Sequence, residues 1–409
     1  MALLDNIWQE ILAEEDAEEP MFVCVACIGD TWLKQRASRR SQAQLCACCG
    51  ASVGEALTSK KIAETIKKHL PDHFAIDYGL HPGYEMGLSR IIGLAIRCES
   101  KAVCNAVAAR LVDLDADEED FYFDGQEYCW ASSPFESEEH ERWWVEGDWT
   151  RIATELVHGR RFFNTNANTF FESLIVEAMR ANSPENAGVA SVVKIVPQGT
   201  RFYRARIAST QGQLLMFQDD PAKQLGAPPK DRAANNRMSP SGVPLLYVAE
   251  DAQTGIAEVR PSIGDKVVVA EFVSARPLEF FDFKALTALK HQAISWFEPG
   301  YQVRTDRRRL LEYLHDLIAQ PVRANDTDYV VTQALAEFIR YYGKQRFDGI
   351  SFRSVQREGG VNYVIFDRSP LESLQIPDWV PQFDLVASKD AVSVFEIARV
   401  EFHATKLGS

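Results

Sequence analysis

The stretch that decides the fold of this chain begins Gly199-Thr-Arg-Phe-Tyr-Arg-Ala-Arg206, continues as Arg237-Met-Ser-Pro-Ser-Gly-Val-Pro-Leu-Leu-Tyr247-Val-Ala-Glu250 and ends Thr254-Gly-Ile-Ala-Glu258. Two related pieces lie far downstream, Phe347-Asp-Gly-Ile-Ser-Phe-Arg-Ser354 and Gly359-Gly-Val-Asn-Tyr-Val-Ile-Phe366. We expect these pieces, although distant in sequence, to fold around one pocket.

The residues around this stretch predict an α+β domain. Short runs rich in β-branched and aromatic residues, bounded by turn residues, predict strands. These runs cover residues 191–196, 201–207, 245–249, 266–273, 278–282, 349–352 and 362–366, with helices expected at 307–318 and 328–342. Many short strands with few helices between them favour α+β over a doubly wound sheet. No Gly-x-Gly-x-x-Gly follows a strand and no Gly-Lys-Ser/Thr loop is present, which excludes a Rossmann or P-loop site.

Composition limits the classes of function. The 409 residues predict two or three domains, and 46% hydrophobic with 25% charged residues indicates a soluble globular protein. The formal net charge of -14 disfavours non-specific binding to nucleic acid or to a membrane surface. No apolar run approaches the roughly 20 residues of a membrane span. The first residues lack the pattern of a signal peptide, and the grouped cysteines suit a reducing compartment, so we expect a cytoplasmic protein.

Four cysteines near the start have the spacing of a zinc site. Cys24-Val-Ala-Cys27 is followed, after eighteen residues, by Cys46-Ala-Cys-Cys49. Two Cys-x-x-Cys knuckles supply the four thiolates of a tetrahedral structural zinc, with no open position for catalysis. Cys48 could replace Cys46 or Cys49, although only the latter two keep the two-residue gap. The alternative is a set of buried free thiols.

The pattern predicts four regions. Residues 1–50 would hold a short N-terminal helix and the cysteine knuckle, and residues 51–185 a mostly helical domain. Turn-forming residues at 182–190 predict a linker. The α+β domain would span 191–375, and residues 376–409 would form a tail packed on it. Within the helical domain, helices are expected at 59–70, 101–114, 149–157 and 170–180, with a long loop at 115–149 that could contain a short strand.

Three side chains in the deciding stretch could contact a ligand. Arg204 lies in a strand pattern, where an arginine needs either a carboxylate partner or an anionic ligand such as phosphate. Arg237 lies in a Pro- and Gly-rich loop, where it could clamp an anion or face solvent. Tyr247 lies on the strand face opposite its neighbours, so it could join the core or stack on a flat ring.

Two further residues carry a carboxylate and a hydroxyl. Thr254 is a reasonable helix N-cap, which would place Glu258 in the first turns of a helix. There the carboxylate could act in chemistry or simply complement the helix dipole. Ser354 ends a strand beside a Gly-Gly turn, where serine commonly makes local hydrogen bonds.

In this order, the pieces resemble the RES-domain family, over roughly residues 195–370. That family is named for an Arg, a Glu and a Ser, and Arg204, Glu258 and Ser354 stand at the matching positions. Arg237 and Tyr247 match further pocket positions. The resemblance implies an ADP-ribosyltransferase-like fold, NAD as substrate, and, since short members act as toxins, a protein inhibitor or antitoxin as partner.

The chemistry implied by the resemblance suits these residues. Cleavage of the nicotinamide–ribose bond passes through an oxocarbenium-like state, which Glu258 could stabilise. Arg204 and Arg237 would neutralise the pyrophosphate of NAD. Ser354 would position the ribose or carboxamide, and Tyr247 would stack on a ring.

The front half, with its cysteines, resembles the zinc-bearing HEPN-like helical domain that precedes some RES domains. HEPN ribonucleases carry an Arg and a His at the spacing of Arg151 and His158, although Ile152 stands where a polar residue is usual. A HEPN-type ribonuclease and a non-catalytic nucleotide-sensing module are therefore the alternatives to an NAD-consuming enzyme. A structural role at a helix end is the simpler explanation for that Arg and His.

Overall fold

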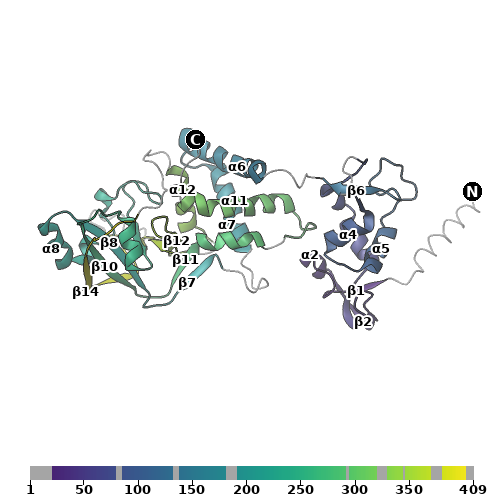
Figure 1. The fold of residues 1–409 in the computed structure, drawn as a ribbon, viewed down its shortest axis with the longest axis horizontal. Helices are drawn as coiled ribbons and strands as arrows, with labels where there is room; N and C mark the ends of the chain where they lie inside the picture. The colour runs from purple at the N-terminus through teal and green to yellow at the C-terminus, as the bar shows by residue number, and fades with distance from the viewer. Residues whose placement is uncertain are drawn as a thin grey trace, which may run out of the picture. The chain divides into compact units, whose positions relative to one another are not determined.

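The chain divides into two compact units in a computed structural model (Figure 1). The structure describes residues 21–79, 85–131, 138–180, 191–291, 294–319, 329–343, 346–369 and 380–401. Unit 1 comprises residues 1–142 and 293–303, and unit 2 comprises residues 143–292 and 304–409. The helix expected in residues 1–20 and the linker expected at 182–190 lie outside the described residues.

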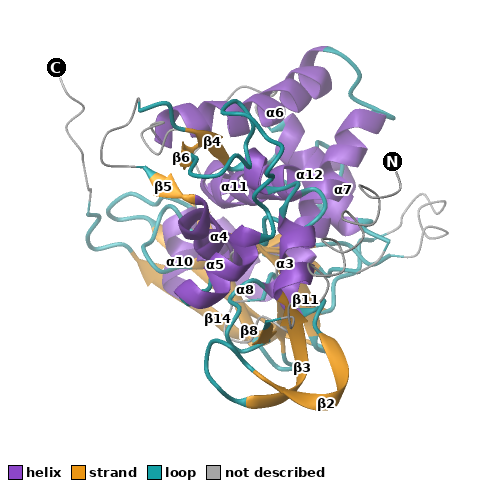
Figure 2. Ribbon diagram, turned by 90° about the vertical axis from the view of Figure 1, so that its right-hand side faces the viewer, coloured by secondary structure: helices purple, strands orange, loops and turns teal. Residues whose placement is uncertain are grey.

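Unit 1 contains two small antiparallel sheets and several helices. The first sheet has the order β1-β3-β2, and β2 and β3 lie side by side in Figure 2. The second sheet has the order β4-β6-β5. The elements are β1 (Phe22–Cys24), α2 (Thr31–Lys34), β2 (Ser38–Leu45), β3 (Ser52–Thr58), α3 (Ser59–Ile66), η1 (Leu70–Asp72), β4 (Phe74–Ile76), β5 (Met86–Gly87), α4 (Leu88–Ile96), α5 (Lys101–Ala109) and β6 (Glu127–Trp130). The region expected to be mostly helical is thus mixed, because it also contains β3, β4, β5 and β6.

A short segment from the second half of the sequence completes the core of unit 1. Phe297 is buried among the apolar side chains of this unit, and the Trp296 ring stacks on His73 with centroids 4.4 Å apart. The Ser295 hydroxyl donates a hydrogen bond of 3.0 Å to Asp30, which also caps α2. Unit 1 is therefore discontinuous in sequence, which the proposed four-region division did not foresee.

Unit 2 is built on an eight-stranded sheet with the order β14-β10-β8-β9-β13-β12-β11-β7. Its strands are β7 (Val193–Val196), β8 (Arg201–Ala208), β9 (Leu246–Ala249), β10 (Lys266–Ser274), β11 (Leu278–Asp282), β12 (Gly349–Arg353), β13 (Val361–Ile365) and β14 (Leu385–Glu396). Neighbouring strands are antiparallel, except that β11 and β12 are parallel. All seven strands expected from the sequence are present, and β14, which the sequence did not predict, extends the sheet beside β10.

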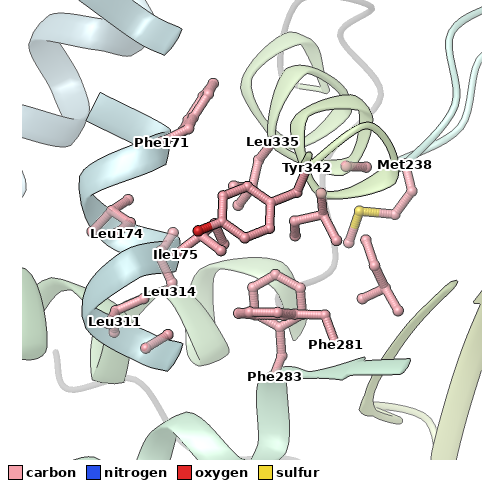
Figure 3. Packing of buried hydrophobic residues seen from close by; sticks show 14 of the residues in the cluster. Phe171, Leu174, Ile175, Met238, Phe281, Phe283, Leu311, Leu314, Leu335 and Tyr342 are labelled. Atoms are coloured by element: carbon pink, nitrogen blue, oxygen red, sulfur yellow. The ribbon is translucent and has the colours of Figure 1, made fainter. Parts of the chain in front are cut away.

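Helices cover this sheet and supply much of its core. They are α6 (Glu138–His158), α7 (Thr165–Arg180), α8 (Gln211–Asp219), α9 (Pro221–Gln224), η2 (Lys230–Arg232), α10 (Ala252–Glu258), η3 (Phe283–His291), α11 (Tyr301–Ala319) and α12 (Val330–Arg340). Figure 3 shows Phe171 and Ile175 of α7 and Leu311 of α11 in one cluster with Phe281 of β11. Burial of such large side chains contributes about 1.5–3 kcal/mol each.

Helix α7 belongs to unit 2 and not to the front half. Besides its apolar face, its buried Glu177 accepts hydrogen bonds from Arg304 at 2.6 Å and Arg308 at 2.8 Å, both on α11. The contacts of α7 therefore place the division between units near residue 142. This position differs from the boundary expected at 182–190, because turn-forming residues in a sequence do not show what the preceding helix packs against.

Candidate active site

A cavity of about 470 Å³ lies in unit 2 beside the weakest pairing of the sheet. Strand β8 pairs with β10 along its length, but it pairs with β9 only at Tyr203 and Ala249. The cavity is lined by residues of β8, β9, β12, β13 and α10 and by the loop before β9. Its volume is typical of a site for a small molecule or cofactor.

The structure brings the five expected pocket residues together in and around this cavity. Arg204, Tyr247 and Glu258 line it. Ser354 does not line the cavity, but its hydroxyl donates a hydrogen bond to Glu258, which does. Arg237 is close enough that the charge of Glu258 acts on its guanidinium.

Arg204 lines the cavity, and within the described part of the chain no carboxylate is paired with it. Its Nη1 atom is buried and has no hydrogen-bond partner among the described residues. Burial lowers the pKa of Arg204 and repulsion from Arg206 lowers it further, whereas Tyr247 raises it. A guanidinium nevertheless stays charged at neutral pH. The carboxylate partner that a purely structural arginine requires is not observed in the described chain, so the site suits an anionic ligand.

Helix α10 presents Glu258 in a manner that differs from the expectation. Asp251 is the N-cap, and its carboxylate accepts a 2.9 Å hydrogen bond from the Thr254 N–H. The Thr254 hydroxyl donates to the same carboxylate at 2.8 Å. The prediction that Thr254 caps the helix was wrong, since an Asp three residues earlier competes for the same role. Glu258 therefore lies in the last turn, where the helix dipole does not favour a carboxylate.

Two buried side chains fix one oxygen of the exposed Glu258 carboxylate. The Ser354 hydroxyl donates to Oε1 at 2.6 Å and the Asn362 amide donates to the same atom at 2.7 Å. Ser354 Oγ also accepts the N–H groups of Gln356 and Arg357, both at 3.1 Å, so its single proton is left for Glu258. Within the described chain, Oε2 accepts no hydrogen bond, which leaves it for a ligand.

The turn between β12 and β13 must approach α10 closely to make these bonds. A Cβ atom on Gly360 would meet the Thr254 side chain at 2.7 and 2.9 Å, so only glycine fits there. In addition, Arg357 Nη1 bonds both carboxylate oxygens of Asp251, at 2.6 and 2.7 Å. The Gly-Gly-Val-Asn sequence thus serves to carry Ser354 and Asn362 to Glu258.

Tyr247 uses its hydroxyl to hold the loop before β9. Its oxygen accepts the Met238 N–H at 3.3 Å and shares a hydrogen bond of 3.3 Å with Ser239. Burial raises the pKa of Tyr247, so the hydroxyl stays protonated at neutral pH. The adjacent Arg237 is partly buried, and burial lowers its pKa while Tyr329, Glu258 and Tyr247 raise it. The surrounding protein therefore helps to position the Arg237 side chain, which does not simply face solvent.

The part of the site that sequence reasoning missed is the support of Glu258. The sequence showed Asn362 only as part of the Gly-Val-Asn motif and Asp251 only as an acidic residue before a helix, so neither received a role. Arg206, a second arginine that lines the cavity, had no assigned role. The alternation of β8 was a usable signal for Arg206, because residues two apart on a strand share a face.

The four expected cysteines of unit 1 form a separate cluster. The Sγ atoms of Cys24, Cys27, Cys46 and Cys49 all lie within 4.8 Å of one another. The Cys24 and Cys49 sulfurs are 3.8 Å apart, close to the edge of a tetrahedron with Zn–S bonds of about 2.3 Å. Cys48 is not a member of the cluster. The four thiols fit a bound metal ion and are compatible with zinc.

The surroundings of the cluster change the pKa values of its thiols in opposite directions. Burial raises the pKa of Cys24 and of Cys27. Burial acts in the same direction on Cys46, but backbone N–H groups of the knuckles lower its pKa to about 6. Peptide N–H groups aimed at sulfur are the means by which such knuckles stabilise thiolates.

The other candidate pair, Arg151 and His158, lies on α6. The Arg151 guanidinium pairs with Asp148 at 3.3 Å and with Glu155 at 3.1 Å, one turn away on either side. His158 is exposed at the end of the helix. Ion pairs at this spacing are a common way to stabilise a helix surface, which is the simpler explanation noted for Arg151.

The pocket residues lie within a part of the chain that matches a known protein family. Residues 201–387 match the family model described as the RES domain. The match includes Arg204, Glu258 and Ser354, and it supports the resemblance found in the sequence. Searches of curated proteins and of solved structures each gave no match. None of the described helices is long and apolar enough to span a bilayer.

Proposed function

We propose that unit 2 is an NAD-consuming enzyme that cleaves the bond between nicotinamide and ribose. The observation that carries the proposal is Glu258, an exposed carboxylate at a cavity, with Oε1 fixed by two buried donors. Arg204 lines the same cavity and is a buried cation without a protein partner for Nη1 in the described chain. A carboxylate and an unpaired cation together suit a substrate with a cationic reacting end and an anionic phosphate.

Glu258 acts on the charge that develops at the ribose. Nicotinamide leaves from a pyridinium, so the departing ring needs no proton and a single carboxylate is sufficient. As the bond lengthens, positive charge grows on the ribose, and Oε2 is available to bond a ribose hydroxyl and stabilise that charge. A preorganised group of this kind commonly supplies the largest catalytic term.

The other residues bind and orient. Arg204 and Arg237 neutralise the pyrophosphate, and the Tyr247 ring stacks on a flat ring of the substrate. Ser354 has a different role from the one its sequence position suggested. Because its hydroxyl proton is already directed at Glu258, Ser354 is a positioning residue for the carboxylate and not a contact for the ribose.

The experiment that tests the proposal is incubation of the purified protein with NAD, followed by identification of all products by mass. Release of nicotinamide is expected. The partner product identifies the acceptor, which is water if ADP-ribose forms, phosphate if its phosphorylated form appears, and a protein if the mass is found on a polypeptide. NAD recovered intact, although bound, would contradict the enzyme and favour a nucleotide-sensing module.

The family match further supports a role as a toxin or defence effector. We propose that this effector acts in the cytoplasm and is held inactive by a protein inhibitor. Expression of the wild-type chain should lower cellular NAD and slow growth, whereas expression of Glu258→Gln should do neither. Equal toxicity of the two chains would contradict this role. A copurifying protein that blocks NAD turnover would identify the inhibitor.

A further inference from the structure

The pocket holds more positive charge than a pyrophosphate requires. Arg204 and Arg206 both line the cavity from β8. Arg237 lies on the Glu258 side, and Arg232 of η2 is close enough for its charge to act on Arg206. Because the chain as a whole has a net charge of -14, a positively charged pocket indicates that this site binds a ligand with several negative charges.

Arg206 and Arg232 repel each other without a protein anion between them. Burial lowers the pKa of Arg206, and the charge of Arg232 lowers it further. Among the residues that the structure describes, no carboxylate forms an ion pair with either side chain. By contrast, Arg201 on the same strand pairs with Glu271 at 3.5 Å. Arg206 lines the cavity, and Arg232 is an exposed side chain near it. Two neighbouring like charges without a counter-ion are stabilised when an anion binds to both.

Arg206 lies two residues after Arg204 on strand β8. Residues two apart on a β-strand lie about 6.6 Å apart along it and point to the same face. If Arg204 contacts the pyrophosphate, Arg206 contacts a group one ribose ring further along the dinucleotide. The group at that place in a phosphorylated dinucleotide is the 2′-phosphate of the adenosine ribose.

We propose that Arg206 and Arg232 form a subsite for a third phosphate, so that the preferred substrate is the 2′-phosphorylated dinucleotide NADP. This inference rests on the proposed function and specifies its substrate. Arginine suits a phosphate monoester because its planar fork bonds two oxygens at once. Arg206 is then a specificity residue, and the reaction releases nicotinamide from NADP with the 2′-phosphate unchanged.

The test uses the full chain and compares binding with turnover. Calorimetry gives the Kd of adenosine 2′,5′-bisphosphate and of AMP, and kinetics give kcat/KM for NADP and NAD. We expect the bisphosphate to bind at least about tenfold more tightly than AMP, as is typical of a hydrogen bond to a charged group, and kcat/KM to favour NADP similarly. Arg206→Ala should remove most of both preferences. Arg201→Ala is the matched control, since it removes an arginine from the same strand but outside the cavity, and it should keep both.

Three results would overturn the subsite. The first is equal binding of the bisphosphate and AMP by the wild-type protein. The second is an equal loss of both ligands in Arg206→Ala. The third is acceleration of NAD turnover by inorganic phosphate with no preference for NADP, which would assign the arginines to a free phosphate ion. A retained preference for the bisphosphate without turnover of either dinucleotide would support the subsite and contradict the proposed reaction.

Discussion

The cysteine cluster of unit 1 and the pocket of unit 2 are both built from polar side chains, but they differ in what they leave unsatisfied. Four sulfurs within 4.8 Å would satisfy one metal ion completely, so that site is closed. Among the described residues, the pocket has a buried guanidinium nitrogen without a partner and a carboxylate with one oxygen bonded and the other available. A metal site whose four positions are all filled by protein ligands contributes to stability, whereas a pocket with unbonded polar atoms is suited to bind a ligand. The predictions below test this difference.

The largest effect is expected from loss of the metal. Structural zinc contributes about 10–16 kcal/mol in small zinc domains, so Cys24→Ser should abolish the folded state around the cysteines. NAD turnover should persist in the fraction of protein whose unit 2 remains folded. Elemental analysis and hydrogen exchange report the two effects separately.

Cys48→Ser is the matched control, because Cys48 is exposed beside the knuckle but is not in the cluster. It should retain one equivalent of zinc. Less than half an equivalent in fresh wild-type protein would contradict the zinc assignment. Loss of all NAD turnover in well-folded, zinc-free protein would show that the cluster has a role beyond stability.

Replacement of Arg204 should separate stability from binding. Arg204→Met removes a buried cation whose Nη1 has no protein partner in the described chain, so the ligand-free protein should gain about 1–3 kcal/mol in its free energy of unfolding. The same change should weaken NAD binding by about 10–100-fold, because a charge-assisted hydrogen bond to phosphate is lost. Urea denaturation and calorimetry measure the two quantities. A less stable protein that binds NAD normally would identify Arg204 as structural.

A smaller effect is expected from Ser354. Ser354→Ala removes one of two donors to Glu258 Oε1, so kcat should fall about tenfold while KM for NAD changes little. Ser351→Ala is the matched control, because this buried serine lies in β12, just before Ser354, donates to Asp282 at 2.9 Å and does not line the cavity. Equal losses in the two variants would mean that strand β12 tolerates no change, and a rise in KM alone would restore a direct contact of Ser354 with the substrate.

The two regions also differ in how far the sequence predicted them. The cysteine cluster follows from spacing over a short stretch, and the structure brings Cys24, Cys27, Cys46 and Cys49 together as expected. The pocket residues were found as a motif, but their mutual contacts depend on the sheet order, which spacing does not contain. The bond from Asn362 to Glu258 joins residues 104 positions apart, and only the close approach at Gly360 makes it possible.

Errors at the level of the fold have similar causes. The stretch around Phe297 has few residues, and nothing local to it shows that it packs with the first half of the chain. Strand β14 was missed because the polar run Ser388-Lys-Asp390 interrupts the apolar residues of its sequence. Asp251 and Thr254 both suit an N-cap, and the choice between them depends on where the preceding strand ends.

The negative charge of Glu258 is the central requirement of the proposed reaction. Glu258→Gln keeps the shape of the side chain and its hydrogen bonds to Ser354 and Asn362 but removes the negative charge. Nicotinamide release should be measured at saturating NAD, with NAD affinity measured on the same samples. We predict a fall in kcat of about 10²–10³-fold, or about 3–4 kcal/mol, with a modest change in affinity since Arg204 and Arg237 still hold the phosphates. A variant that keeps more than about a tenth of wild-type turnover, against this expected loss, would contradict the assignment of Glu258 or the cleavage of NAD itself.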